Sequence, residues 1–149
     1  MRLDNMVVRT GVAQSGMTVG QVFRECVDRQ VPGIPFVDTE GRLSGRVSIR
    51  NTLKQTCIPE FMVRHAHLLG DDVRSLRIPE EHARRVLDMP VDPFVMARIA
   101  TITSHSPVVK ALAIMEEYNT SYIFVLDGED YRGVVTLMGI ACRMLELKG

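Results

Sequence analysis

Three histidines and a cysteine are the residues of this chain best suited to hold a metal ion. His65 and His67 stand two positions apart, with Cys57 or His82 as a further ligand. Imidazole nitrogens and thiolates are the usual ligands of zinc. On a helix, however, residues two apart point to different sides, whereas helical zinc sites space their histidines at i and i+4. The spacing therefore favours solvated or interface histidines, and we predict no metal site.

Recognisable catalytic motifs are missing from the sequence. It contains no G-x-S-x-G elbow, no phosphate-binding Walker loop, no H-E-x-x-H helix and no C-x-x-C pair. Asp38 and Asp127 each follow an apolar run, but acidic residues are also common where a turn begins. Ser48 and Thr136 stand where helices are expected to start, a position that favours hydroxyl side chains as caps. We therefore predict that the protein is not an enzyme.

The composition is that of an ordinary globular protein. Of the 149 residues, 46% are apolar, which is enough to bury a core, and 18 basic residues balance 18 acidic ones. A neutral chain gives no electrostatic reason to expect binding to nucleic acid or to an anionic membrane. Three widely spaced cysteines do not make a disulfide framework, and neither a membrane-spanning run nor a signal peptide is evident. These features predict a cytoplasmic protein.

A repeat runs through the chain. Residues 34–38, Ile-Pro-Phe-Val-Asp, are echoed by residues 123–127, Ile-Phe-Val-Leu-Asp, and residues 45–49, Gly-Arg-Val-Ser-Ile, by residues 133–137, Gly-Val-Val-Thr-Leu. The aspartate and the glycine are seven positions apart in the first copy and six in the second. Apolar runs joined by short connectors of Gly and acidic residues are typical of β-hairpins. We therefore predict two hairpins whose turns differ in length by one residue.

A helix is predicted before and after each hairpin. Apolar residues recur at helical spacing over residues 19–27 and 108–115. A second helix closes each copy, running from about residue 138 to 147 in the second. A short extended segment precedes the first helix of each copy, at residues 10–13 and 99–102. The expected order in each copy is strand, helix, strand, strand, helix.

Helix starts and the segment between the copies also carry local signals. Thr18 with Gln21 three positions later is a capping-box pattern, and Ser106 before Pro107 predicts a cap and a first helical turn. The segment between the copies lacks the Gly/Ser richness of a flexible linker. Acidic residues at the start of residues 79–87 and basic residues near their end predict a helix there. We expect a helical connector that lies over the core or at a dimer interface.

This order of elements, found twice, resembles the CBS motif named after cystathionine β-synthase. In that motif an apolar-Pro-apolar-apolar-Asp run precedes the hairpin and Gly-apolar-apolar-Ser/Thr follows it, and two motifs normally pair as a Bateman module. The resemblance covers residues 7–53 and 91–147. It implies an α/β fold of the α+β type, with two motifs packed about a pseudo-two-fold axis. The implied division is residues 1–53 for the first motif, 54–90 for a helical connector and 91–149 for the second motif.

The resemblance implies a ligand. CBS pairs often bind AMP, ADP, ATP, S-adenosylmethionine or related compounds in clefts between their motifs. In the family a Ser or Thr and the following helix N-terminus meet phosphate, and an Asp three positions later holds the ribose. Here Ser48 and Thr136 match the hydroxyl positions, but Asn51 and Gly139 replace the aspartate. Asn51 can still accept one ribose hydroxyl, without charge assistance, so the first half-site is the better candidate.

Further contacts follow from the resemblance, and each has a plainer alternative. Adenine is expected against apolar residues and a neighbouring strand, with arginines facing phosphate. Ser48 and Thr136 can instead act as caps alone. Asn51 can be a solvated helix residue and Arg46 the exposed side of a strand. The predicted ligand contacts are Ser48, Asn51, Thr136, Ile34, Pro35, Thr101, Ile102, Tyr122, Phe124, Arg46 and Arg50, with Lys54 as a further phosphate contact.

The resemblance implies a regulatory module and not a catalyst. We predict a homodimer in which an adenine-containing ligand favours one arrangement of the halves, read by the dimer or by an effector protein in trans. No cofactor is expected to be required. The alternative is a ligand-free structural module that assembles with a partner protein, which Asn51 and Gly139 favour. Stabilisation by a nucleotide would distinguish the two.

Overall fold

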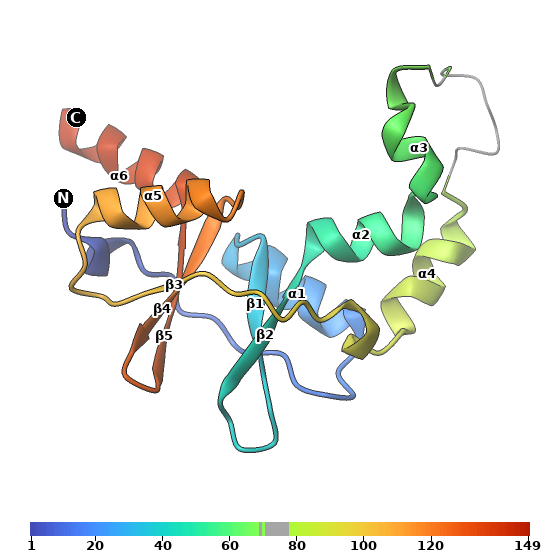
Figure 1. The fold of residues 1–149 in the computed structure, drawn as a ribbon, viewed down its shortest axis with the longest axis horizontal. Helices are drawn as coiled ribbons and strands as arrows, with labels where there is room; N and C mark the ends of the chain where they lie inside the picture. Colours follow the sequence, from blue (N-terminus) through green and yellow to red (C-terminus); the bar gives the residue numbers. More distant parts are fainter. Residues whose placement is uncertain (69, 71–77) are drawn as a thin grey trace.

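The computed structural model (Figure 1) describes residues 1–68, 70 and 78–149 of the chain. Each half of the molecule contains a small sheet and two helices, as the repeat predicts. The strand expected at residues 10–13 is not formed: that segment makes only an isolated bridge between Ala13 and Phe36. The first half comprises α1 (Val19–Arg29), β1 (Gly33–Val37), β2 (Leu43–Ser48) and α2 (Ile49–Cys57). The second comprises β3 (Thr101–Ile102), α5 (Val108–Glu117), β4 (Tyr122–Asp127), β5 (Asp130–Thr136) and α6 (Leu137–Lys148). The predicted mixed α+β fold is confirmed.

The connector between the halves is helical where the structure describes it. It contains α3 (Glu60–Arg64), a 3-10 turn (Ala66–Leu68) and α4 (Glu80–Asp88). Helix α4 confirms the helix predicted over residues 79–87. Two further 3-10 turns, Leu3–Met6 and Asp92–Phe94, precede the two halves. The remainder of the predicted helical connector, residues 69 and 71–77, lies outside the described residues.

The two predicted helix starts have different outcomes. At α1 the capping box is confirmed: Thr18 Oγ1 accepts from the N–H of Gln21 at 3.1 Å, and the Gln21 side chain accepts from the N–H of Thr18 at 2.9 Å. At α5 the prediction is wrong, because Pro107 itself occupies the cap position with no side-chain bond. The Ser106 hydroxyl lies 2.8 Å from the hydroxyl of Thr103 instead and is therefore committed to the preceding turn.

The hairpins differ in length where the repeat predicts. Both are antiparallel and both contain one irregularity in register. In the first hairpin Val37 pairs with Leu43 and encloses five residues, whereas the equivalent pair, Leu126 with Tyr131, encloses four. The one-residue difference between the copies therefore lies in the turn, and the strands keep the same pairing.

The segment that precedes each half crosses to the sheet of the other half. Val8 pairs with Val134 on β5 through two backbone hydrogen bonds of 2.9 Å. Met96 pairs in the same way with Arg46 on β2, at 2.8 and 2.9 Å. The residues that follow each crossing then pair with β1 or β4 of their own half. In each sheet, therefore, one edge is formed by a segment of the same half. The other edge is formed by the segment that precedes the opposite half.

The repeated glycine makes room for these crossings. A Cβ atom on Gly45 would lie 2.7 Å from the backbone oxygen of Met96, and one on Gly133 would strike the backbone oxygen of Val8. Gly133 also has φ of 147°, a conformation that residues with a Cβ rarely adopt. The glycine that recurs in both copies is thus required by the close approach of another backbone.

Because the segments cross, the residues before each half are buried against the opposite half. Leu3 and Met6, before the first half, are buried in the cluster of the second half. Val91 and Phe94, before the second half, are buried in a cluster that consists mainly of first-half residues and also contains Tyr122, Phe124 and Val134. The division at residues 53 and 90 stays a prediction, and packing joins residues from both sides of it.

Helix α4 of the connector covers the helices of the first half. Val86 is buried against that half, and a Cβ on Gly20 of α1 would lie only 3.1 Å from the backbone oxygen of Leu87. The ring Nε2 of His82 lies 2.7 Å from the backbone oxygen of Thr56 on α2. The connector helix α4 therefore shields part of the surface of the first half from solvent.

The remaining histidines and cysteines form no cluster in the described part of the chain. His65 and His67 are exposed, and within residues 1–68, 70 and 78–149 no three His, Cys, Asp or Glu side chains lie close enough to hold a metal ion. Cys26, Cys57 and Cys142 are free thiols. None of the helices that the structure describes is long and apolar enough to cross a bilayer.

Candidate functional site

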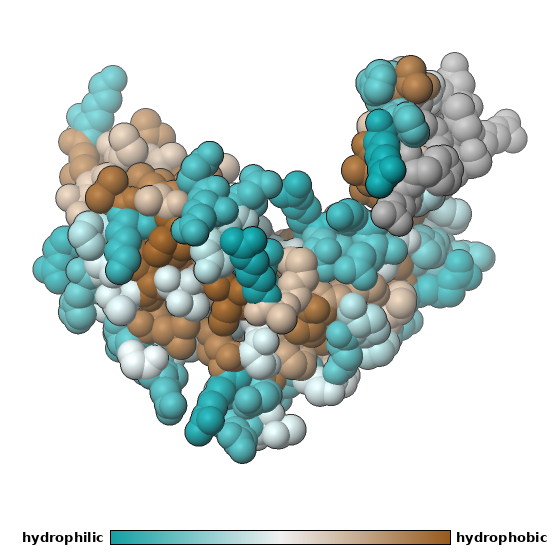
Figure 2. All heavy atoms as spheres, in the orientation of Figure 1, coloured by the Kyte–Doolittle hydropathy of each residue, from teal (hydrophilic) through white to brown (hydrophobic). Residues whose placement is uncertain are grey.

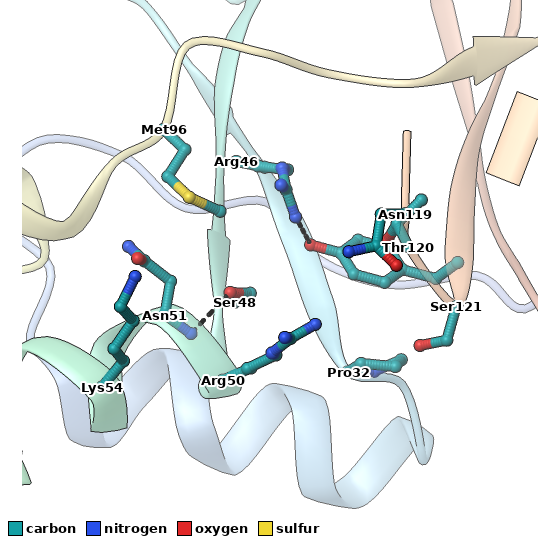
Figure 3. Close-up of a pocket in the computed structure, with 11 residues that line it drawn as sticks. Pro32, Arg46, Ser48, Arg50, Asn51, Lys54, Met96, Asn119, Thr120 and Ser121 are labelled. Atoms are coloured by element: carbon teal, nitrogen blue, oxygen red, sulfur yellow. Dashed lines mark hydrogen bonds between the residues drawn. The ribbon is translucent and has the colours of Figure 1, made fainter. Parts of the chain in front are cut away.

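A cleft of about 230 Å³ lies where the two halves meet (Figure 3). The first half contributes β2, α2 and the turn before β1, and the second half contributes the loop between α5 and β4. The segment that crosses from the second half to β2 adds one side chain. The lining residues are Pro32, Arg46, Ser48, Arg50, Asn51, Lys54, Met96, Asn119, Thr120, Ser121 and Tyr122. Neither half alone builds this cleft.

Ser48 stands where β2 passes into α2. Its Oγ accepts a hydrogen bond from the backbone N–H of Asn51 at 3.0 Å and thereby caps the helix. The residue is only 4% exposed. The remaining free N–H groups at a helix N-terminus attract anions. This end of α2 can therefore be capped and still present donors to an anionic ligand.

The side chain of Asn51 is already hydrogen-bonded on both sides. Its Nδ2 donates to the backbone oxygen of Phe94 at 3.2 Å, and its Oδ1 accepts from Nε2 of Gln55 at 3.2 Å. An amide oxygen has two lone pairs, so Oδ1 keeps one acceptor position. Asn51 therefore offers the cleft at most one neutral acceptor without breaking these bonds.

Arg46 joins the two halves across the cleft. Its Nη1 donates to the hydroxyl of Tyr122 on β4 at 2.6 Å (dashed line at Arg46 in Figure 3). Its Nε donates to the backbone oxygen of Arg98 at 2.9 Å. The guanidinium also lies 5.7 Å from the centre of the Tyr122 ring. Burial raises the pKa of Tyr122, and the charge and hydrogen bond of Arg46 oppose part of that rise. Tyr122 is thus a neutral acceptor for Arg46.

The charges around the cleft have one sign. Arg46, Arg50 and Lys54 line it, and none of its other lining residues carries a carboxylate. Arg50 and Lys54 are exposed at their positions on α2, so their side chains can reorient toward a ligand at little cost. Positive charge without a compensating acid favours an anionic ligand.

The equivalent place in the second half is chemically different. Thr136 caps α6 as Ser48 caps α2, with Oγ1 accepting from the N–H of Gly139 at 2.8 Å. The repeat, however, places Met138 at the position of Arg50, Gly139 at that of Asn51, and Cys142 at that of Lys54. The second half therefore keeps the helix cap and lacks the cations.

Residues 88–145 match the family model described as "CBS domain". The second half of this chain is a CBS domain. The predicted resemblance is thereby confirmed, and solved structures extend it to the other half. A CBS domain-containing protein of Bacillus anthracis superimposes with a TM-score of 0.64 at 18% identity, over 100% of this chain and 95% of its own. The chain as a whole has the fold of a CBS pair.

Two further proteins of similar structure were solved with ligands. CBSX2 in complex with AMP has a TM-score of 0.65 at 14% identity, covering 99% of each chain. The CBS domain pair of protein MJ0100, in complex with 5′-methylthioadenosine and S-adenosyl-L-methionine, has a TM-score of 0.63 at 16% identity, over 100% of this chain and 98% of its own. No curated protein matches the sequence.

The cleft of this CBS pair brings together about half of the predicted ligand contacts. Arg46, Ser48, Arg50, Asn51 and Tyr122 line it, as does Lys54. The structure places the other predicted contacts elsewhere, because β4 is buried on both faces and β1 lies in the core of the first half. Ile34, Pro35, Ile102 and Phe124 are buried, Thr101 is exposed beside β4, and Thr136 caps α6. Contact of these residues with a ligand stays a prediction.

Five lining residues of the CBS pair were not predicted. Pro32 and residues 119–121 occupy equivalent connections between a helix and a strand, and Met96 belongs to the crossing segment. Just after the two helices that precede these connections, Gln30 and Asn119 have positive φ of 57° and 51°. An Asn at the end of a helix is a signal for such a left-handed residue. Nothing in the sequence indicated that this loop faces the opposite half.

Proposed function

We propose that this CBS pair is a regulatory module that binds an adenine nucleotide or a related adenosyl compound in the composite cleft. The observation that carries the proposal is the cleft itself, which both halves line and which joins a capped helix N-terminus to three cations. CBS pairs of the same fold hold AMP in one case and 5′-methylthioadenosine with S-adenosyl-L-methionine in another. The ligand class is therefore compatible with both the fold and the lining residues.

Five of the lining residues have distinct tasks in this proposal. The N-terminal amides of α2 and the hydroxyl of Ser48 meet the phosphate, as amides at helix N-termini do elsewhere. Arg50 and Lys54 neutralise its charge. The ring of Tyr122 provides an aromatic face for the adenine, and Asn51 provides one neutral acceptor for the ribose. The buried residues predicted to contact adenine then support the cleft from behind.

The signal in this proposal is a change in the relation between the halves. Arg46 connects β2 to Tyr122 and to the backbone of Arg98, so its guanidinium holds both halves in one arrangement. The cleft, at about 230 Å³, is slightly smaller than the 300–1,000 Å³ usual for small-molecule sites. A phosphate that attracts Arg46 away from Tyr122 would enlarge the cleft and favour a second arrangement. A dimer or an effector protein in trans would read that change.

We further propose that the protein is a homodimer assembled through α5 and α6. Figure 2 shows apolar side chains over this end of the molecule. Val109 is 72% exposed and Met144 is 56% exposed. In the first half the equivalent positions, Gly20 and Thr56, lie under α4. A two-fold axis would let the uncovered faces of two copies shield each other.

A second candidate is a ligand-free module that assembles with a partner protein. The engaged amide of Asn51 favours it, because a ribose would have to compete with or add to bonds already made. Under either candidate we propose no catalytic role. We place the protein in the cytoplasm, where three free thiols would remain reduced.

Thermal unfolding with AMP, ADP, ATP, S-adenosylmethionine and 5′-methylthioadenosine tests the proposal. A ligand at a hundred times its dissociation constant adds about 2.7 kcal/mol, which raises the Tm by several degrees. Ser48→Ala and Thr136→Ala each remove one helix cap and should lower the Tm of the free protein similarly. Only Ser48→Ala should abolish the shift caused by the ligand. No shift with any compound, in a folded dimer, would favour the ligand-free module.

A further inference from the structure

The composite cleft carries a more specific inference about its ligand, which rests on the proposed function. We infer that the cleft binds one phosphate-bearing nucleotide per chain, selects it by the charge of its phosphates and is nearly indifferent to its ribose hydroxyls. S-adenosylmethionine, whose sulfonium and ammonium groups outweigh its carboxylate, is then a poor ligand. The inference depends on three features of the lining residues: their charge, their hydrogen bonds and their counterparts in the second half.

The first feature is the unbalanced positive charge. Arg46, Arg50 and Lys54 lie around a single cavity, and no Asp or Glu is among its lining residues. A ligand with two or more phosphates gains from all three cations, AMP gains less, and an uncharged adenosyl compound gains nothing. A ligand with net positive charge meets repulsion without a carboxylate to relieve it. Ligand charge is therefore the property that this cleft distinguishes most strongly.

The second feature is the lack of a charged acceptor for the ribose. A carboxylate can accept from both hydroxyls of a ribose at once, and such bonds are stronger than neutral ones. Asn51, in the first turn of α2, is one of the two amide side chains that line the cleft. Its amide is already hydrogen-bonded to the backbone oxygen of Phe94 and to the side chain of Gln55. Asn119, the other amide that lines the cleft, is neutral as well. Removing a ribose hydroxyl therefore removes at most a neutral hydrogen bond.

The third feature is the chemistry of the second half. The positions equivalent to Arg46, Arg50 and Lys54 are Val134, Met138 and Cys142. Val134 is fully buried and Met138 is 74% exposed, so no cation replaces the missing ones at these positions. Thr136 still caps its helix, which shows that a cap alone does not make the charged environment. The stoichiometry expected from the charges is one nucleotide per chain.

Isothermal titration of the full chain with ATP, 2′-deoxy-ATP and S-adenosylmethionine tests the inference. ATP should bind at one per chain. The deoxy compound should bind no more than about tenfold more weakly, the upper limit expected for the loss of one neutral hydrogen bond. S-adenosylmethionine should bind at least about tenfold more weakly than ATP, and the ATP affinity should fall as the salt concentration rises.

A pair of charge-matched variants locates the effect. Arg50→Ala with Lys54→Ala should weaken ATP binding by about tenfold, because each partly exposed cation contributes modestly. Arg42→Ala with Arg84→Ala removes the same charge from exposed positions outside the cleft, and ATP binding should be unchanged. Equal losses in both variants would mean that overall charge and not the cleft attracts the nucleotide, which would overturn the inference.

The inference and the proposed function fail in different ways. If S-adenosylmethionine binds as tightly as ATP, or if 2′-deoxy-ATP loses more than about tenfold as expected for a charged ribose acceptor, the inference is wrong and the regulatory module stands. Two nucleotides per chain would likewise overturn the single-site inference alone. If none of the three compounds binds the folded protein, and AMP, ADP and 5′-methylthioadenosine give no thermal shift either, the proposed function fails with it.

Discussion

The two halves of this CBS pair share a hairpin flanked by two helices and have different surfaces. The first half carries three cations beside a capped helix and has α4 packed over its helices. The second half has the same cap without the cations and leaves the apolar side chains of α5 and α6 exposed. The two copies thus share the residues that the sheets require and differ in the residues around them. We interpret the first half as the binding half and the second as the assembling half.

Substitutions of the glycine common to both halves should cause the largest loss of stability. Gly133→Ala places a Cβ against the backbone of Val8 at φ of 147°, and it should destabilise the protein by about 3–4 kcal/mol. Gly45→Ala meets the backbone of Met96 at a φ that alanine tolerates, and should cost about 2–3 kcal/mol. Urea unfolding at equilibrium measures both changes.

Gly41 provides the control for this pair. It has φ of 79° in the first hairpin turn, and a Cβ there would meet nothing within 4 Å. Gly41→Ala should therefore cost only about 1 kcal/mol, from backbone strain alone. If all three variants lost the same stability, the crossing segments would not be held as tightly as the structure indicates.

The sequence predicts the local features of the fold and misses the crossing of the two segments between the halves. The repeat, the capping box at Thr18 and the length difference between the hairpins were all predictable, because the order of residues along the chain reveals each of them without knowledge of the packing. The exchange of edges was not, since pairing Val8 with Val134 brings together residues 126 positions apart and leaves no local pattern. The composite cleft could not be predicted in full for the same reason, because only the packing of the two halves brings residues 119–121 to the cleft that Ser48 lines.

Substitutions on the exposed apolar surface of α5 and α6, which differs from that of the first half, should give the next largest effect. If α5 and α6 form the dimer interface, Val109→Glu with Met144→Glu should weaken self-association by at least about 2 kcal/mol, roughly thirtyfold in the dissociation constant. Sedimentation equilibrium measures the change. Both side chains are well exposed in one chain, so the folded monomer should tolerate the variant.

Val27→Glu is the matched control in the binding half. Val27 lies on α1 and is 62% exposed, comparable with Val109 and Met144. A carboxylate there should leave the dimer intact. Dissociation by Val27→Glu, with a dimer that survives the changes in α5 and α6, would reverse the assignment of the assembling half.

The smallest predicted effect concerns the contact between the halves. Arg46→Ala removes the hydrogen bonds to Tyr122 and to the backbone of Arg98, and should lower the free energy of unfolding by about 1–2 kcal/mol. The pKa of Tyr122 should rise further, because Arg46 opposes the rise that burial causes. Alkaline titration of the phenol absorbance, read as the difference between proteins with and without Tyr122→Phe, measures that shift.

The same variant separates two tasks of Arg46. As a phosphate contact its loss should weaken ATP binding, but as a contact between the halves its loss should also free Tyr122 and ease opening of the cleft. These effects oppose each other, so Arg46→Ala should weaken ATP binding less than Arg50→Ala does. Arg46→Lys keeps the charge but cannot make both hydrogen bonds in the same geometry. A lysine variant that binds ATP more tightly than wild type would show that the bridge to Tyr122 holds the cleft closed. If Arg46→Ala instead weakens ATP binding as much as Arg50→Ala does, and Arg46→Lys binds no more tightly than wild type, Arg46 acts in phosphate binding alone.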